Sequence, residues 1–357
     1  MLGFNYIALH YIKYFLIILV ALTAFFVGFD YMGNAEKLSI SANLLLIYLV
    51  YKTFFAIDML LPLSLVFGMI STKIFLIRSN ALVSFFSLGY SRVDVLKPFV
   101  VVSVLITMLF ISLHSWPNFA RADEFSNNIR KNAQYLNPTK DLFFAYQGKY
   151  IYFSELFPLQ EKADGIRVFT VKNNSLKSIL EASSATYRNG FWYIKEADII
   201  TKPDDLSFKS LGIKVTQTKD LKILNGFRPK MLDQVYEGKV NFTIKNAIDA
   251  ILLLDNQNID TSTIKGALYK IFIYPFFAPF LIVIIFFFVP ISVRFLNVSL
   301  FSFGAILSTL LTWGILFMLI ELSNNKTIPS EFGVILPIFF LFLVAIWQWM
   351  RHRASTS

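Results

Sequence analysis

The sequence predicts a polytopic α-helical membrane protein, with six membrane-spanning helices arranged three and three around an inserted all-β domain, a sandwich or a jelly roll. Hydrophobic residues make up 56% of its 357 residues and charged residues only 16%. A soluble domain of ordinary composition carries about a quarter charged residues. One long polar stretch separates the third apolar segment from the fourth. This composition excludes a disordered chain, a secreted disulfide scaffold and an ordinary nucleic-acid-binding domain.

A helix needs roughly 20 predominantly apolar residues to cross the hydrocarbon core of a bilayer. Scanning at this length predicts six spans, at residues 14–29, 44–70, 99–113, 271–289, 298–320 and 332–350. The first span follows a short basic region, as a signal peptide would. Because no small-x-small cleavage site ends it, we expect an uncleaved helix.

The second span contains Lys52, Asp58 and Pro62. Lys52 and Asp58 occupy different helix faces, because their spacing turns an α-helix by about 240° past a full turn. Charged groups at such depth usually face protein or water. Two interpretations remain open: Lys52 snorkels to the outer interface while Asp58 bonds a neighbouring helix, or both line a polar cavity for a charged substrate. Pro62 allows a kink.

Lys and Arg in the short loops predict the orientation. One side of the membrane carries most of these cations: Lys13, Lys73, Arg78, Arg92, Lys97, Arg294, Arg351 and Arg353. The short loops on the other side carry Lys37 and Lys326 among acidic residues. We therefore expect both termini in the cytoplasm and the polar stretch outside. The lack of Cys is compatible with a bacterial periplasm.

The polar stretch has the size of an ordinary domain. The expected boundaries are 1–115 for the first three spans, 116–265 for the inserted domain and 266–357 for the last three spans. Strands are predicted within 143–153 and at 165–171, 178–187, 191–194, 207–214 and 215–223. Asn189-Gly190 is a strong hairpin signal. Short strands at regular spacing predict a sandwich or jelly roll. The two ends, 119–132 and 243–255, resemble helices.

Motifs for enzymatic chemistry are missing from the sequence. It contains no G-x-x-x-x-G-K-[ST], G-x-S-x-G or H-E-x-x-H pattern and no Cys, and its three His are far apart. Asp204 and Asp205 follow Lys-Pro in what is by default a solvated turn. We therefore expect no enzyme activity, no cofactor and no metal site.

The loop at 71–98 contains a short apolar helix formed by Leu82, Phe85, Phe86 and Leu88, with Gly89 as a stop signal. The helix is too short to cross a membrane. It either lies on the membrane surface or docks into a groove of a cytoplasmic partner.

Residues 78–91 resemble the R-S/N-E-L-x-A-L-x-A-x-G-x-S pattern of the lipopolysaccharide export permeases, the LptF/LptG family. The resemblance extends to the architecture of essentially the whole chain, because that family also places a periplasmic jelly roll between two sets of three spans. Residues 11–16 and 265–275 resemble the starts of its first and fourth spans. The acidic residue of the pattern is Ala81 here, so docking would depend on apolar contacts and on Arg78 or Arg92.

The resemblance implies one half of a heterodimeric permease in the bacterial inner membrane, paired with a paralogous six-span subunit. A cytoplasmic ABC ATPase dimer would drive it. The pair would take lipopolysaccharide from the outer leaflet and pass it through the jelly roll to a periplasmic bridge protein of the same fold. No nucleic acid is expected to bind.

The resemblance also assigns residues. ATPase coupling would involve Arg78, Ser79, Asn80, Leu82, Phe85, Leu88, Gly89 and Ser91. A lateral gate between the first and fifth spans would include Phe25, Phe26, Phe29, Phe317 and Ile320. Lys37 and Lys52 would attract lipid phosphates or acidic sugars.

Three other functions compete with this one. A force-transmitting ABC permease that carries no lipid usually has its large external domain after the first span. A membrane scaffold or sensor needs fewer spans and no coupling helix. A lipid transferase would need acidic or His clusters at a membrane edge, and the sequence contains none.

Overall fold

The computed structural model describes residues 2–38, 42–130, 139–146, 148–157, 161–172, 175–203, 212–225, 243–254, 262–288 and 298–354. The chain forms two compact units. The membrane unit comprises Met1–Lys131, Asn241–Ala247 and Lys265–Ser357, and the β unit comprises Asn132–Val240 and Ile248–Ile264. The helical start of the polar stretch therefore belongs with the membrane helices.

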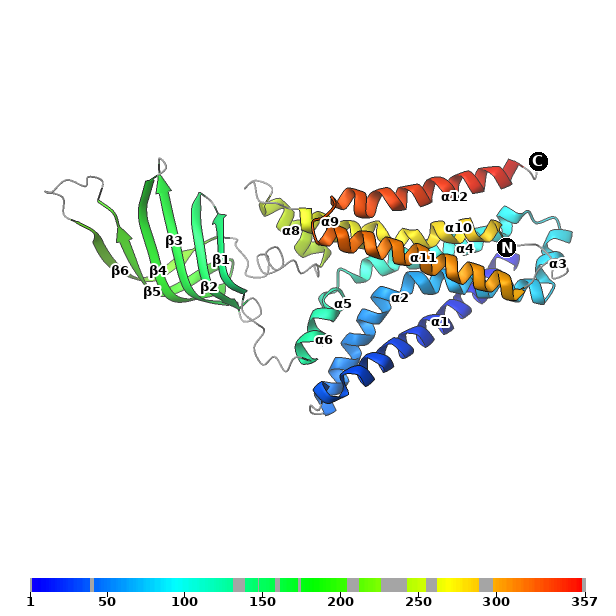
Figure 1. Cartoon of the computed structure of the whole chain (residues 1–357), viewed down its shortest axis with the longest axis horizontal. Helices are drawn as coiled ribbons and strands as arrows, with labels where there is room; N and C mark the ends of the chain where they lie inside the picture. The colour runs from blue at the N-terminus through cyan, green and yellow to red at the C-terminus, as the bar shows by residue number, and fades with distance from the viewer. Residues whose placement is uncertain are drawn as a thin grey trace. The chain divides into compact units, whose positions relative to one another are not determined.

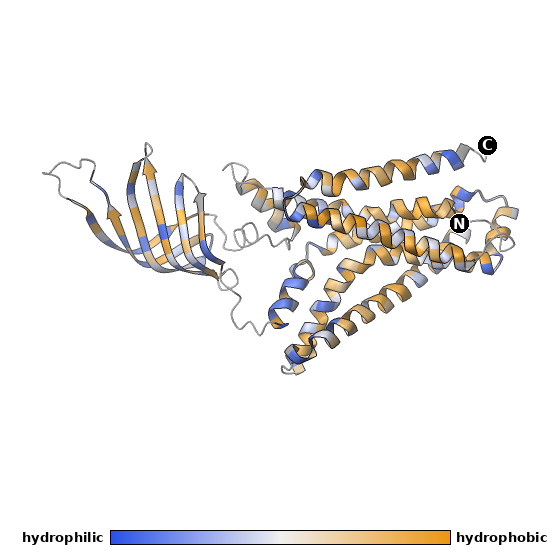
Figure 2. Ribbon diagram, viewed as in Figure 1, coloured by the Kyte–Doolittle hydropathy of each residue, from blue (hydrophilic) through white to orange (hydrophobic). Residues whose placement is uncertain are grey.

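Six helical segments in the described residues are long and apolar enough to cross a membrane, as predicted (Figures 1 and 2). They are α1 (Leu2–Asn34), α2 (Ala42–Arg78), α4 (Arg92–Leu113), α9 (Ser262–Phe272) continuing through η3 (Tyr274–Phe276) into α10 (Phe277–Phe287), α11 (Val298–Asn324), and the π-turn η5 (Glu331–Ile335) with α12 (Leu336–Ala354). Shorter elements are η1 (Ala35–Leu38), α3 (Ala81–Ser87), α5 (Pro117–Ala120), α6 (Ala122–Arg130) and α8 (Ile244–Leu254). The helices expected at both ends of the insert and in the loop at 71–98 are thus present.

Helix α2 is the centre of the membrane unit, because α1, α6, α10 and α11 all pack against it. Residues 61–66 are buried without interruption, which is typical of a helix surrounded by protein. Gly68 allows α1 to approach closely, since a Cβ at this position would lie only 2.9 Å from the Cα of Phe15. Tyr11 of α1 then donates a hydrogen bond to the Leu65 carbonyl at 3.1 Å.

The fourth span is broken rather than continuous. α9 ends at Phe272, a 3₁₀ turn follows at Tyr274–Phe276, and α10 begins at Phe277. Pro275 and Pro279 lack the backbone N–H that an uninterrupted helix needs at these positions. The break places the Tyr274 side chain at a junction between two helices.

The described strands of the β unit form one antiparallel sheet in the order β1-β2-β3-β4-β5-β6 (Figure 1). The strands are β1 (Thr139–Tyr146), β2 (Lys149–Phe157), β3 (Lys162–Lys172), β4 (Ser175–Arg188), β5 (Phe191–Thr201) and β6 (Lys214–Ile223). Asn189 and Gly190 both have positive φ, which confirms the predicted hairpin turn. The inserted β domain is confirmed as one curved sheet, whereas most of the strand predicted at 207–214 lies outside the described residues.

A line of irregular positions bends this sheet. Three residues inside strands have no partner in the register of a neighbouring strand. They are Asp141 in the β1–β2 pairing, Gly165 in the β2–β3 pairing and Asp220 in the β5–β6 pairing. All three residues have positive φ. The side-chain alternation changes phase at Gly165, since Ala163 and Ile166 are both buried. The bends curl the sheet into a trough with an apolar inner face.

Candidate functional site

The segment between α2 and α4 is built by local backbone chemistry. Asn80 has a positive φ of 58° directly before α3, and Gly89 has a φ of 85° directly after it. Ser91 caps α4, because its hydroxyl accepts from the Asp94 N–H while the Asp94 carboxylate accepts from the Ser91 N–H. This capping box fixes where α4 begins. The segment is therefore a short helix between two turns whose backbone conformations are fixed by local residues.

Only part of this segment faces outward. Leu82 is 2% exposed and belongs to the core of the membrane unit. Phe85 packs against the rings of Tyr6 and Tyr90. Gly3 lies against both Phe85 and Tyr90, so the start of α1 supports α3 from inside.

The outward face of the segment differs from the face that the apolar pattern suggests. Arg78, Ser79 and Asn80 are exposed, and so are Gly89 and Leu88, the latter to 74%. Val83 is also exposed and was not singled out from the sequence. Ser91 is partly buried as a helix cap. A docking partner would therefore contact Val83 and Leu88, while Leu82 and Phe85 hold the helix in place.

Lys73 is a buried cation one turn before this segment. Its Nζ donates a hydrogen bond to the carbonyl of Phe286 and lies 3.6 Å from the centre of the Phe286 ring. Carbonyls in the last turn of a helix lack an intrahelical donor. Lys73 therefore caps the end of α10 and connects it to the end of α2.

A second buried cation, Lys52, is paired across the α1–α2 hairpin. Its Nζ lies 3.1 Å from Oδ1 of Asp30, and the Tyr48 hydroxyl donates to the same carboxylate. The rings of Phe26 and Phe55 lie 5.9 and 4.9 Å from the Lys52 ammonium. Lys52 is thus neutralised by Asp30 and does not snorkel as an isolated charge. Lys37 belongs to η1, and its side chain lies outside the described residues.

Asp58 bonds a neighbouring helix, which agrees with the Asp58 part of the first open interpretation but not with its snorkelling Lys52. Its Oδ1 lies 2.9 Å from Nε2 of His114, the residue that follows α4. Lys52 and Asp58 therefore have separate partners and form no pair with each other.

The aromatic residues predicted for a gate divide into outward and inward groups. Phe25 and Phe29 are exposed on α1 with ring centres 4.4 Å apart, whereas Phe26 packs against Phe55. On α11, Phe317 is exposed and stacks on Trp313, whereas Ile320 is buried. Helix α1 packs on α2 and α4, and α11 packs on α2 and η5. The exposed aromatic residues predicted for the gate therefore lie on two helices that both pack on α2.

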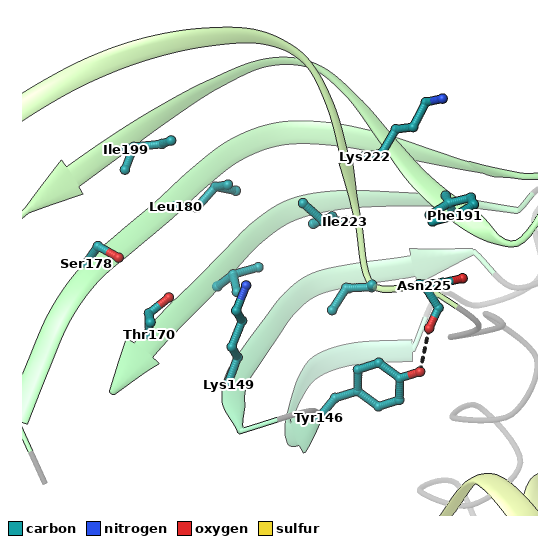
Figure 3. Close-up of a pocket in the computed structure, with 12 residues that line it drawn as sticks. Tyr146, Lys149, Thr170, Ser178, Leu180, Phe191, Ile199, Lys222, Ile223 and Asn225 are labelled. Atoms are coloured by element: carbon teal, nitrogen blue, oxygen red, sulfur yellow. Dashed lines mark hydrogen bonds between the residues drawn. The ribbon is translucent and has the colours of Figure 1, made fainter. Parts of the chain in front are cut away.

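The trough of the β unit contains a cavity of about 390 Å³ (Figure 3). Its apolar walls include Val168, Leu180, Phe191, Ile199 and Ile223. The volume falls within the range of about 300–1,000 Å³ that is typical of ligand sites. The family resemblance implies an apolar slot for acyl chains in the jelly roll, but the residues that line this cavity were not predicted, because they depend on where the sheet bends.

Polar groups also border this cavity. Tyr146 donates a hydrogen bond to the Asn225 carbonyl at 2.6 Å, and burial raises the pKa of the Tyr146 hydroxyl (Figure 3). Lys149 lines the cavity, shares a face of β2 with the buried Ile151 and is exposed to solvent. Lys222 borders the cavity too, but its ammonium lies 5.4 Å from the centre of the Tyr193 ring on the outer face of the sheet. Apolar walls with an exposed cation, Lys149, beside them suit an amphiphile that carries an anionic group. Within the described residues, no cluster of three or more His, Asp or Glu side chains could hold a metal ion.

Comparisons with known proteins agree with the architecture. A family described as lipopolysaccharide export system permease LptF/LptG matches residues 5–351. A comparison with curated proteins finds no match.

Proposed function

The chain belongs to the lipopolysaccharide export permease family LptF/LptG, and from this premise we propose how it works as a subunit of an ABC transporter. The chain takes lipopolysaccharide from the inner membrane together with a paralogous six-span subunit. It passes the lipid through its β unit to a periplasmic bridge protein. A separate cytoplasmic ATPase dimer supplies the energy. Both termini are cytoplasmic in this proposal, and the β unit is periplasmic.

The observation that carries the proposal is the cavity in the bent sheet. Leu180, Ile199 and Ile223 offer apolar surface to an acyl chain, while the exposed Lys149 beside them can pair with phosphate. A slot of this chemistry matches a phosphorylated glycolipid better than a soluble peptide or sugar. The open strands β1 and β6 at the two edges of the described sheet are available for pairing with a bridge protein of the same fold.

ATP-driven motion enters through the outward face of α3. Val83, Leu88 and Arg78 are the proposed contacts, with Ser79, Asn80 and Gly89 forming the rest of that surface. Motion of α3 would reach α4 through the Ser91 cap and α10 through Lys73. The buried Leu82 and the half-buried Phe85 make α3 move as part of the bundle.

Lipid would enter beside the exposed aromatic faces of α1 and α11, at Phe25, Phe29 and Phe317. A lipid phosphate that approached Lys52 would have to compete with Asp30 for the same ammonium group. We therefore propose that Lys52 engages substrate only when the Asp30 pair opens.

Purification of the tagged full chain from native membranes in mild detergent tests this function. Mass spectrometry should find a P-loop ATPase, a second six-span permease and lipopolysaccharide bound to it. Recovery of the ATPase without the glycolipid would favour a force-transmitting permease. A folded preparation that carries neither would favour a membrane scaffold.

A further inference from the structure

The backbone at the end of helix α3 brings two aromatic rings together. Gly89 has a φ of 85°, and its N–H donates to the Phe86 carbonyl at 3.0 Å. The Tyr90 N–H donates to the Phe85 carbonyl at 3.1 Å. These two bonds form a Schellman motif, which also places the side chains of its outer two residues in contact. The Phe85 and Tyr90 rings accordingly meet edge to face with centres 5.5 Å apart, so this ring pair is fixed to α3.

The first turns of α1 pack on the ring pair. Gly3 is buried, and a Cβ at its position would lie 3.0 Å from both Cε1 of Phe85 and the hydroxyl oxygen of Tyr90. Tyr6 is three residues further along and therefore lies on the same face of α1. Its ring centre is 6.1 Å from that of Phe85. Even a methyl group at position 3 would press on both rings, so the glycine sets how closely α1 approaches α3.

The same face of α1 also contacts the end of α2 that leads into α3. The His10 ring stacks on the Phe75 ring, with centres 4.8 Å apart and planes inclined by 15°. The Phe75 carbonyl accepts the Ser79 N–H at 2.9 Å, where α2 ends. The start of α1, the end of α2 and α3 therefore form one packed body.

Helix α1 extends from this body to the aromatic residues of the proposed lipid entry. It runs for 33 residues and contains no proline that would kink it. It approaches α2 closely at Gly68, where a Cβ would lie 2.9 Å from the Cα of Phe15. The exposed Phe25 and Phe29 lie beyond this contact. Tyr6 and Phe25 are about 29 Å apart along the helix axis, so a tilt imposed at Tyr6 moves Phe25 about the close contact.

We propose that Gly3 and Tyr6 are positioning residues that pass the motion of α3 directly to α1, with the contact between Gly68 and Phe15 as the pivot. The inference rests on the proposed function, in which the ATPase moves α3 and lipid enters beside Phe25. The contacts described above for that motion reach α4 and α10, whereas this one reaches a helix of the gate. Breaking it leaves the outward face of α3 available to the ATPase but disconnects α1 from α3.

The first test measures the lipopolysaccharide released per ATP hydrolysed by the complete complex in proteoliposomes. Tyr6→Ala removes the ring that faces Phe85 and should lower this ratio by about tenfold, while ATPase binding is unchanged. Tyr6→Phe keeps the ring and should retain the ratio of the unmodified chain. Leu9→Ala, at an exposed position in the same part of α1, is the matched control and should also behave like the unmodified chain.

A reversible crosslink distinguishes loss of transmission from loss of folding. The chain has no native Cys, so Tyr6→Cys with Phe85→Cys places a single pair of thiols in it. The reduced pair should show the low ratio. A short bis-methanethiosulfonate crosslink should restore the ratio in the same sample, because α1 and α3 would again move together. The same reagent on Tyr6→Cys alone should restore nothing.

Three results would overturn the inference: an unchanged ratio in Tyr6→Ala, loss of ATPase binding in that variant, or a crosslink that fails to restore release. A complex that releases no lipopolysaccharide even without substitutions would instead refute the proposed function.

Discussion

Replacing Asp30 by Asn should destabilise the membrane unit far more than replacing Asp30 and Lys52 together. The Lys52 side chain is 7% exposed and its ammonium lies 3.1 Å from the Asp30 carboxylate. At an effective dielectric constant of about 20, two charges at this separation attract by about 5 kcal/mol. Removing one partner leaves a buried unpaired charge, which costs about 3–5 kcal/mol. Replacing both by neutral side chains of similar size is close to neutral.

A double-mutant cycle measures this difference. Asp30→Asn, Lys52→Met and the double variant are unfolded by SDS in mixed micelles, followed by far-ultraviolet circular dichroism. Lys52→Met should be milder than Asp30→Asn, because Tyr48 still donates to the remaining carboxylate. We expect a coupling energy of about 3 kcal/mol between Asp30 and Lys52.

The Lys97–Asp94 pair is the matched control for this cycle. Its atoms are 2.7 Å apart, but the two side chains are 53% and 39% exposed. Solvent screens such a pair, so its coupling energy should be only about 0.2–1 kcal/mol. If the coupling at Lys52–Asp30 were no larger than that of the control, the pair would not be electrostatically buried and the reasoning would be refuted.

Three further predictions concern other parts of the chain. Ser91→Ala removes the cap of α4 and should lower the free energy of unfolding by about 1 kcal/mol in the same SDS titration; no loss would mean that the cap is dispensable. Trp192→Ala removes a fully buried ring from the β unit and should cost about 3–5 kcal/mol in urea unfolding, whereas the exposed Val215→Ala should change it by less than about 0.5 kcal/mol. Leu88→Asp should weaken ATPase binding by about tenfold at unchanged stability, whereas Leu82→Asp should unfold the segment; equal effects on stability would contradict the assigned faces.

Hydropathy alone predicted where the six spans lie, because every crossing helix must satisfy the same length and composition limits. The Asn189-Gly190 turn and the helix stopped by Gly89 were predicted for a related reason. Both depend on residues whose local backbone preferences are strong, and both show the expected positive φ. Such local backbone preferences do not depend on how the helices and strands pack together.

Contacts between distant residues were beyond a single sequence. The partner of Lys52 is Asp30 on the preceding helix, and the partner of Asp58 is His114 at the end of α4. Both pairings depend on which helices pack together. Leu82 matched an apolar docking pattern, but the same pattern also describes a helix packed on its own bundle.

The residues that line the cavity could not be predicted from the sequence for a different reason. Strand alternation predicts which residues share a face only while the pairing is regular. At Gly165 the strand bends, so that Ala163 and Ile166 are both buried although they are an odd number of positions apart. A hidden change of phase of this kind cannot be located from hydrophobic alternation, although a glycine inside a strand is a signal for it.

In the proposed function, lipopolysaccharide passes through the trough of the β unit and ATP hydrolysis supplies the energy. A photocrosslinking amino acid at Leu180, which lines the cavity, tests it directly in proteoliposomes that contain the full complex. The same group at Ile179 is the control, because this residue directly precedes Leu180 and lies on the opposite face of β4. We expect lipopolysaccharide crosslinks at Leu180 that increase with ATP and are weak at Ile179. Equal crosslinking at both positions, or crosslinks at Leu180 that do not depend on ATP, would contradict it.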